Sequence, residues 1–274
     1  MSPDDFEDVQ AEPDALRQAR RATELMAVYQ QRGTELARLR REAIERATLE
    51  RGMTFSAVAA ALGLSKGRIS QIRQSAPPAE RALFGVGPLT VAVPLRESPG
   101  RDAGVIAVED SLAAQRLTDT LETLNFEVRQ FQIPVSGEWD PVDGAIAICG
   151  PKSSRIIAAA IETDPWLSFQ ADDNDKWVIR DRETGQALVS PLDRDSDSED
   201  IAYVGRLAYT GGTLIVIAGV HALGSLGAVA HLAENARELY ERVGTQCFSM
   251  VIRSQFESDK VTETEELWSA QVHP

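Results

Sequence analysis

Basic and hydrogen-bonding side chains gather at the end of the segment FSAVAAALGLSKGRISQI, residues 55–72, and just beyond it. Arginine and glutamine can each make paired hydrogen bonds to a base edge, so Arg68 and Gln71 are candidates for reading a DNA sequence. Phosphate contacts are expected from Lys66, Arg73 and the arginines of the preceding residues, among them Arg41. The side chains expected to contact DNA are Lys66, Arg68, Ser70, Gln71, Arg73 and Arg41.

Two short helices joined by a tight turn would have to position these side chains. Ala59 is small where such helices cross most closely, and Gly63 suits a turn that needs a positive φ. Ser65 is a good N-cap for the second helix, whose first residues would face the major groove. The apolar residues expected to hold the helices together are Val58, Leu62, Leu64, Ile69 and Ile72.

This segment resembles the helix-turn-helix of bacterial transcriptional regulators, specifically the sigma-factor-like class, with MTFSAVAAALGLSKGRISQIRQ as the two-helix reader. The resemblance covers about a quarter of the chain. It implies a sequence-specific regulator with double-stranded DNA as partner, bound as a two-fold dimer, because one recognition helix buries little surface. The alternative is a helical hairpin that contacts another protein.

Helical periodicity also precedes this segment. Apolar residues recur from Asp14 to Gln31 with a stop at Gly33, and a second pattern runs from Thr34 to Gly52. The apolar stripe of the first helix could dimerise or could pack on the DNA-reading helices. Residues 1–12 are acidic and lack periodicity, so we expect a mobile tail there.

Charge is divided unevenly along the 274 residues. Residues 13–78 hold 12 Lys and Arg against 6 Asp and Glu, which gives this segment a net charge of +6. Because the whole chain has a net charge of −14, the other residues together carry −20. This distribution suits a basic DNA-binding module on an acidic body. No apolar run approaches the roughly 20 residues that span a bilayer, and the start lacks a signal-peptide pattern, so a cytoplasmic protein without membrane contact is expected.

A Pro-, Gly- and Ala-rich stretch at residues 75–89 marks the best domain boundary. We expect a tail at 1–12, an all-α helix-turn-helix domain at 13–76, a linker at 77–88 and an α/β domain at 89–274. Apolar runs such as AIAIC and LIVIAG predict central strands covered on both faces, in a Rossmann-like mixed sheet, with WVIRDRETGQALVS as an antiparallel hairpin. The phrases AICGPKSS, SPLD, IAYVGRL and IAGVHALGSLGA resemble an uncharacterised α/β domain that follows helix-turn-helix segments in actinobacterial proteins.

Two strand-to-helix junctions of this domain have the chemistry of anion sites. In AICGPKSSR, helix amides, two hydroxyls and a lysine would suit a phosphate or a carboxylate. In IAGVHALGSLG the glycine spacing matches neither a dinucleotide fingerprint nor a phosphate loop, so no cofactor is expected. The residues expected to bind a ligand are Gly150, Lys152, Ser153, Ser154, Arg206, Gly219, His221 and Gly224.

Three functions remain open for the α/β domain. A sensor of an anionic small molecule, such as a nucleotide-like one, is favoured because no catalytic triad or metal cluster emerges. The alternatives are a nucleotide- or nucleoside-processing enzyme with His221 as first catalytic suspect, and an oligomerisation scaffold. Two other features have ordinary explanations: Cys149 and Cys247 are expected to be buried free thiols, and the run at 193–200 to be a solvated acidic loop rather than a calcium site.

Overall fold

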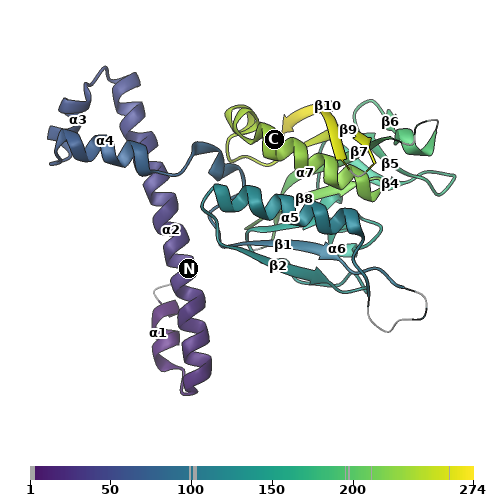
Figure 1. The fold of residues 1–274 in the computed structure, drawn as a ribbon, viewed down its shortest axis with the longest axis horizontal. Coiled ribbons are helices and arrows are strands. Elements are labelled where there is room, and N and C mark those ends of the chain that lie inside the picture. The colour runs from purple at the N-terminus through teal and green to yellow at the C-terminus, as the bar shows by residue number, and fades with distance from the viewer. Residues whose placement is uncertain are drawn as a thin grey trace.

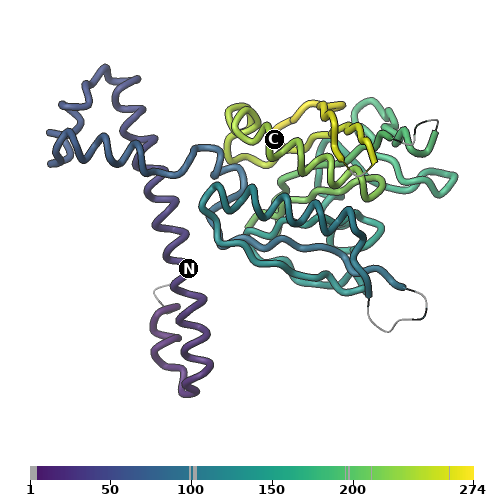
Figure 2. The backbone as a smooth tube through the Cα atoms, in the orientation of Figure 1, coloured from purple at the N-terminus to yellow at the C-terminus, as the bar shows by residue number. Residues whose placement is uncertain are grey.

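The computed structural model describes residues 4–98, 100, 104–194, 196, 198–210, 212–258 and 260–274. A long N-terminal helix lies beside an α/β body, and two short helices lie at one end of the long helix (Figure 1). Figure 2 follows the chain from these short helices through a single connection into the α/β body. No helix in the described residues is long and apolar enough to cross a membrane.

The N-terminal part is helical from Asp4 onward. The expected mobile tail is replaced, over the described residues, by a short helix packed against the long one. The expected break at Gly33 is absent, because one glycine costs only about 1 kcal/mol in a helix interior and the surrounding residues favour helix. The helices are α1 (Asp4–Ala11), α2 (Ala15–Glu50), α3 (Phe55–Ala61) and α4 (Lys66–Ser75).

A mixed sheet of seven strands forms the centre of the α/β body, in the order β10-β9-β7-β8-β3-β1-β2. β2, β1, β3 and β8 are parallel neighbours, whereas β7, β9 and β10 continue the sheet as antiparallel strands. The strands are β1 (Leu89–Pro94), β2 (Val128–Ile133), β3 (Ala145–Ile148), β7 (Glu199–Tyr209), β8 (Gly212–Gly219), β9 (Phe248–Glu257) and β10 (Lys260–Val272).

Helices cover both faces of this sheet. On one face α5 (Val108–Thr123) and α7 (Ala222–Val243) lie side by side, as Figure 1 shows. On the other face lie α6 (Arg155–Glu162) and a small sheet of β4 (Leu167–Ala171), β5 (Trp177–Asp181) and β6 (Ala187–Leu188). Two apolar cores result, one on each face, which explains the strands without polar alternation.

The strand predictions are confirmed for the parallel part of the sheet, and the hairpin prediction is confirmed by the antiparallel pair β5–β6. Gly185 lies in the turn of that pair with φ of +73°. The short helices η1 (Ala79–Leu83) and η2 (Pro191–Asp193), together with β4 and β10, were not predicted.

Candidate functional site

A small apolar core holds α3 and α4 against the end of α2. Its buried members are Ile44 from α2, Val58 and Ala59 from α3, and Ile69 and Ile72 from α4. The amide of each helix's third residue donates to its N-cap hydroxyl. In α3 the bond runs from the Ala57 amide to Thr54 Oγ1 at 3.2 Å, and in α4 from the Arg68 amide to Ser65 Oγ at 3.1 Å.

The turn between α3 and α4 has the expected geometry at Gly63, whose φ is +66°. Two of the five residues predicted for this core, Leu62 and Leu64, are not part of it. Their side chains point outward at the turn and are 53% and 36% exposed. The core is therefore smaller than the sequence suggested, and Ile44 of α2 supplies the missing apolar contact.

One face of α4 is exposed and polar, and it carries Lys66, Arg68, Ser70 and Gln71. The Arg68 guanidinium donates to Gln71 Oε1 at 2.7 Å, so the two candidate base readers lie side by side. The other predicted DNA contacts are partly engaged within the protein. Arg41 and Arg73 lie 3.1 and 3.8 Å from the Glu45 carboxylate, and the Arg73 guanidinium stacks over the Phe55 ring.

A pocket of about 770 Å³ lies at the carboxyl ends of β1, β3 and β8. The β1–α5–β2 connection leads to one side of β1, whereas β3 lies on its other side. Open α/β sheets bind ligands where the strand order reverses in this way. The first turns of α5, α6 and α7 all reach this pocket.

Six of the eight residues predicted to bind a ligand line the pocket: Gly150, Lys152, Ser153, Ser154, Gly219 and His221. Lys152 and the neighbouring Arg155 are exposed and make no ion pair among the described residues. The Ser154 hydroxyl is not free, because it is buried and donates to the Gly137 carbonyl at 2.6 Å. An anion would therefore meet the first amides of α6 and these two cations.

Two pocket residues, Arg96 and Asp110, come from parts of the chain that the sequence did not connect to the site, and the buried Cys149 lies beside the predicted Gly150. Arg96 follows β1 and donates to Asp110 of α5 at 2.6 Å. Burial raises the pKa of Asp110, although the Arg96 charge opposes this shift. Cys149 forms part of the wall as a buried free thiol, as predicted, and burial raises its pKa to about 12, so it is a poor nucleophile.

Gly224 has a packing role next to the pocket. A Cβ on this residue would lie 2.4 Å from the Ile201 carbonyl oxygen, and its amide donates to the buried Asp200 carboxylate at 2.6 Å. Asp200 also accepts from the Ser190 hydroxyl at 2.6 Å and from the His221 amide at 3.2 Å. Asp200 therefore caps α7 from within the protein, and the first turn of α5 carries the acidic Glu109 and Asp110. Of the three helix starts at the pocket, α6 is therefore the one suited to an external anion.

Arg206 lies outside the pocket, contrary to the prediction that it would face the ligand. β7 runs antiparallel to β8, so Ala202 pairs with Gly219 at the pocket edge, whereas Arg206 pairs with Ile215 farther from it. The Arg206 side chain is buried near η1, with the Ala82 carbonyl 3.5 Å from its guanidinium, and burial lowers its pKa.

His221 contacts the acidic run that resembled the start of a calcium loop. Its Nε2 lies 3.3 Å from Asp193 Oδ2, and its ring borders the pocket. Two residues of that run, Asp195 and Asp197, lie outside the described residues. Among the residues that are described, no group of three His, Cys, Asp or Glu side chains is placed to hold a metal ion.

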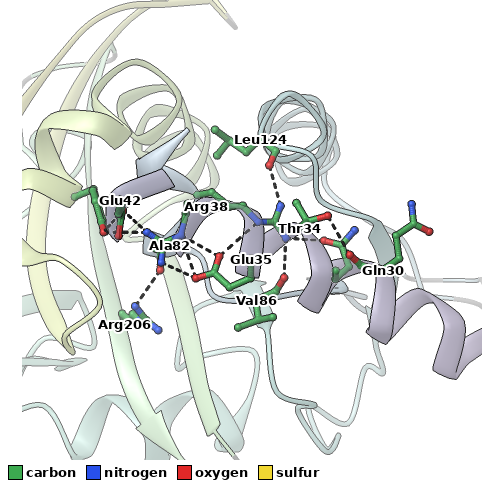
Figure 3. A network of polar contacts seen from close by, with 12 residues as sticks. Gln30, Thr34, Glu35, Arg38, Glu42, Ala82, Val86, Leu124 and Arg206 are labelled. Atoms are coloured by element: carbon green, nitrogen blue, oxygen red, sulfur yellow. Dashed lines mark hydrogen bonds and ion pairs between the residues drawn. The ribbon is translucent and has the colours of Figure 1, made fainter. Parts of the chain in front are cut away.

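A buried polar joint connects α2 to the α/β body (Figure 3). Arg81 of η1 is fully buried and donates to Gln31 of α2 and to the carbonyls of Val86 and Leu124, at 2.7 to 2.8 Å. Its guanidinium also lies over the Phe126 ring, 3.6 Å from the centroid.

A second arginine extends this joint toward the long helix of the body. Arg38 of α2 pairs with Glu35 and Glu42, and it lies 3.4 Å from the Tyr240 hydroxyl of α7. The joint thus reaches the same helix, α7, whose first turn borders the pocket.

No family model, curated protein or solved structure matches this chain. The features that can indicate a function are therefore the exposed face of α4, the pocket, and the joint between α2 and the α/β body.

Proposed function

We propose that this protein is a sequence-specific DNA-binding regulator in which α3 and α4 form a helix-turn-helix and α4 enters the major groove. The observation that carries the proposal is the exposed face of α4, where Arg68 and Gln71 lie together on a helix fixed by Ser65 and by the core around Ile44. When α4 lies in the major groove, Arg68 and Gln71 would exchange their contact with each other for hydrogen bonds to base edges.

The pocket of the α/β body is the proposed sensor site for an anionic small molecule. Its volume of about 770 Å³ falls within the range of ligand pockets, and Lys152, Arg155 and the start of α6 supply positive potential at one side. A nucleotide-like molecule fits this chemistry, since its phosphate would bind there.

The joint at Arg81 and Arg38 supplies the coupling in this proposal. The pocket borders the start of α7, and the Tyr240 hydroxyl near the other end of the same helix contacts Arg38 of α2. A ligand that shifts α7 would change the angle of α2 and thus the placement of α4. To regulate, it must favour one arrangement by about 1 to 3 kcal/mol.

DNA binding by the full chain tests the first part of the proposal. Fluorescence anisotropy would compare its own upstream DNA with a scrambled duplex, for the natural chain and for Arg68→Ala, Gln71→Ala. We expect preference for the upstream DNA in the natural chain and loss of about tenfold or more of that preference in the variant. An exposed arginine of α7 gives the control Arg237→Ala. Equal binding to both duplexes by the natural chain would contradict the proposal.

A second candidate function, a nucleotide- or nucleoside-processing enzyme, is favoured by one observation. The His221 imidazole borders the pocket and faces the Asp193 carboxylate, a pairing that orients a general base. Incubation with nucleoside mono-, di- and triphosphates separates the two functions. Turnover that is lost in His221→Ala would establish the enzyme, whereas thermal stabilisation without turnover, lost in Lys152→Ala but kept in Lys260→Ala, would establish the sensor.

A further inference from the structure

An apolar stripe on α2 is largely exposed, and two of its members, Gly33 and Leu36, also border pockets beside the α/β body. Met26, Tyr29 and Leu36 are 71%, 48% and 65% exposed, and Gly33 lies between them with open space where a Cβ would be. We call these four residues the α2 stripe. Their spacing of three, four and three residues is that of the a and d positions of a coiled coil.

The other described residues leave most of the α2 stripe exposed. Gln31 and Arg38, which bind the α/β body, lie on the opposite side of a helix with 3.6 residues per turn. The helices α3 and α4 pack farther along α2, around Ile44. α1 lies along the first turns of α2, where Gln18 donates to the Val9 carbonyl. Of the two alternatives for the apolar residues between Asp14 and Gln31, packing on the DNA-reading helices is therefore not observed among the described residues.

We propose that the α2 stripe is the contact with a second copy of this chain, in a parallel, two-fold arrangement of the two α2 helices. Exposed apolar surface at heptad spacing is suited to knobs-into-holes packing against an identical stripe. Gly33 lets the partner backbone approach closely at the centre of the contact. Because a two-fold interface uses the same patch twice, the stripe needs no further complementary surface.

The charged residues beside the stripe favour the parallel orientation. In a parallel pair, Arg32 at a flanking position faces Ala37 of the other copy, whereas an antiparallel pair centred on Gly33 brings two Arg32 side chains together. The next core position after Leu36 is Arg40, where two guanidinium groups would repel each other. The contact therefore ends there, and the two helices can diverge before α3.

This inference rests on the proposed function in one respect, because parallel α2 helices carry both copies of α4 at the same end. Two readers related by a two-fold axis match a DNA site with two half-sites. The contact between the stripes itself forms without DNA, so it can be tested separately.

Sedimentation velocity of the full chain without DNA tests the α2 stripe. We expect a concentration-dependent dimer for the natural chain and at least about tenfold weaker association for Met26→Glu, Leu36→Glu, since each copy would bury two charges. The matched control is Leu16→Glu, Leu49→Glu, on the same helix, outside the stripe and 82% and 83% exposed. All four positions are exposed, so helical content by circular dichroism should not change.

Cross-linking reports the orientation. Oxidation should join two copies of Leu36→Cys, because a parallel pair places both residues opposite each other, whereas Leu49→Cys should not cross-link. A monomeric natural chain, or a dimer unchanged by the Met26 and Leu36 substitutions, would overturn the inference. Either result leaves DNA reading by α4 to be decided by Arg68→Ala, Gln71→Ala, so the two proposals can fail independently.

Discussion

Asp200 shows how a single buried carboxylate organises the edge of the pocket. It is fully buried on β7, and its oxygens accept hydrogen bonds from Ser190 and from the amides of Ile201, His221 and Gly224. Burial raises its pKa, and these hydrogen bonds oppose the rise. The first turn of α7 is thereby held in place without any contribution from a ligand.

Gly224 provides a prediction at the scale of one residue. Gly224→Ala places a Cβ against the Ile201 carbonyl, which belongs to a central strand and cannot move away easily. We expect a loss of about 1 to 3 kcal/mol in the free energy of unfolding, measured by urea denaturation.

Gly67 is the matched control for that measurement. It lies in the first turn of α4, where an added Cβ meets nothing closer than 4.0 Å. Gly67→Ala should stabilise the protein by up to about 1 kcal/mol, because alanine favours helix. A Gly224→Ala variant as stable as the natural chain would show that α7 is not packed against β7 as closely as described.

Sequence patterns predicted six pocket residues, all of which lie at or just after the carboxyl ends of β3 and β8, where glycines interrupt the apolar runs. This succeeded because ligand sites in open α/β sheets collect at carboxyl ends of strands. Arg96, Asp110 and Asp200 could not be found in this way, since their partners lie far along the chain. Arg206 was misplaced because the sequence did not show how far along β7 the antiparallel register would carry it.

At the scale of elements, the sequence predicted structure best where the residues that contact each other are also close together in the chain. The cap Ser65 and the turn at Gly63 follow from such signals. The sequence did not predict β10, because its less exposed positions include Thr264 and Glu266, which interrupt the apolar alternation expected of a strand.

The joint between α2 and η1 provides the prediction at this scale. Arg81→Met removes the donors that satisfy Gln31 and the carbonyls of Val86 and Leu124 in a buried place. Burial lowers the pKa of Arg81 to about 10, so the guanidinium is still charged at neutral pH. We expect the free energy of unfolding to fall by about 3 kcal/mol.

Limited proteolysis would locate the effect of Arg81→Met at the joint, as faster cleavage between α4 and β1 than in the natural chain. The control is Arg116→Met, whose exposed ion pair with Glu234 should matter by less than about 0.5 kcal/mol. Equal stability and equal cleavage of the two variants would argue against a rigid joint and against coupling through it.

At the scale of the whole molecule, charge is distributed unevenly between the helices that precede the α/β body and the body itself. Residues 13–78 carry a net charge of +6, whereas residues 1–12, which include α1, carry −5 and residues 79–274 carry −15. The proposed DNA contacts therefore lie on a basic segment, and the acidic body would repel DNA phosphates. Such a molecule should bind DNA through few contacts and should depend on sequence recognition for affinity. Two copies joined along the α2 stripe would double those contacts.

The most direct test of DNA reading by α4 is the salt dependence of binding to the protein's own upstream DNA, from about 50 to about 200 mM salt. For the natural chain we predict a linear fall of log affinity with log salt concentration. Removing one phosphate contact in Lys66→Ala should reduce the slope by about one for each copy bound, with sequence preference retained. A slope and an affinity that are the same in Lys66→Ala, and also in Arg68→Ala, Gln71→Ala, would show that α4 does not touch DNA.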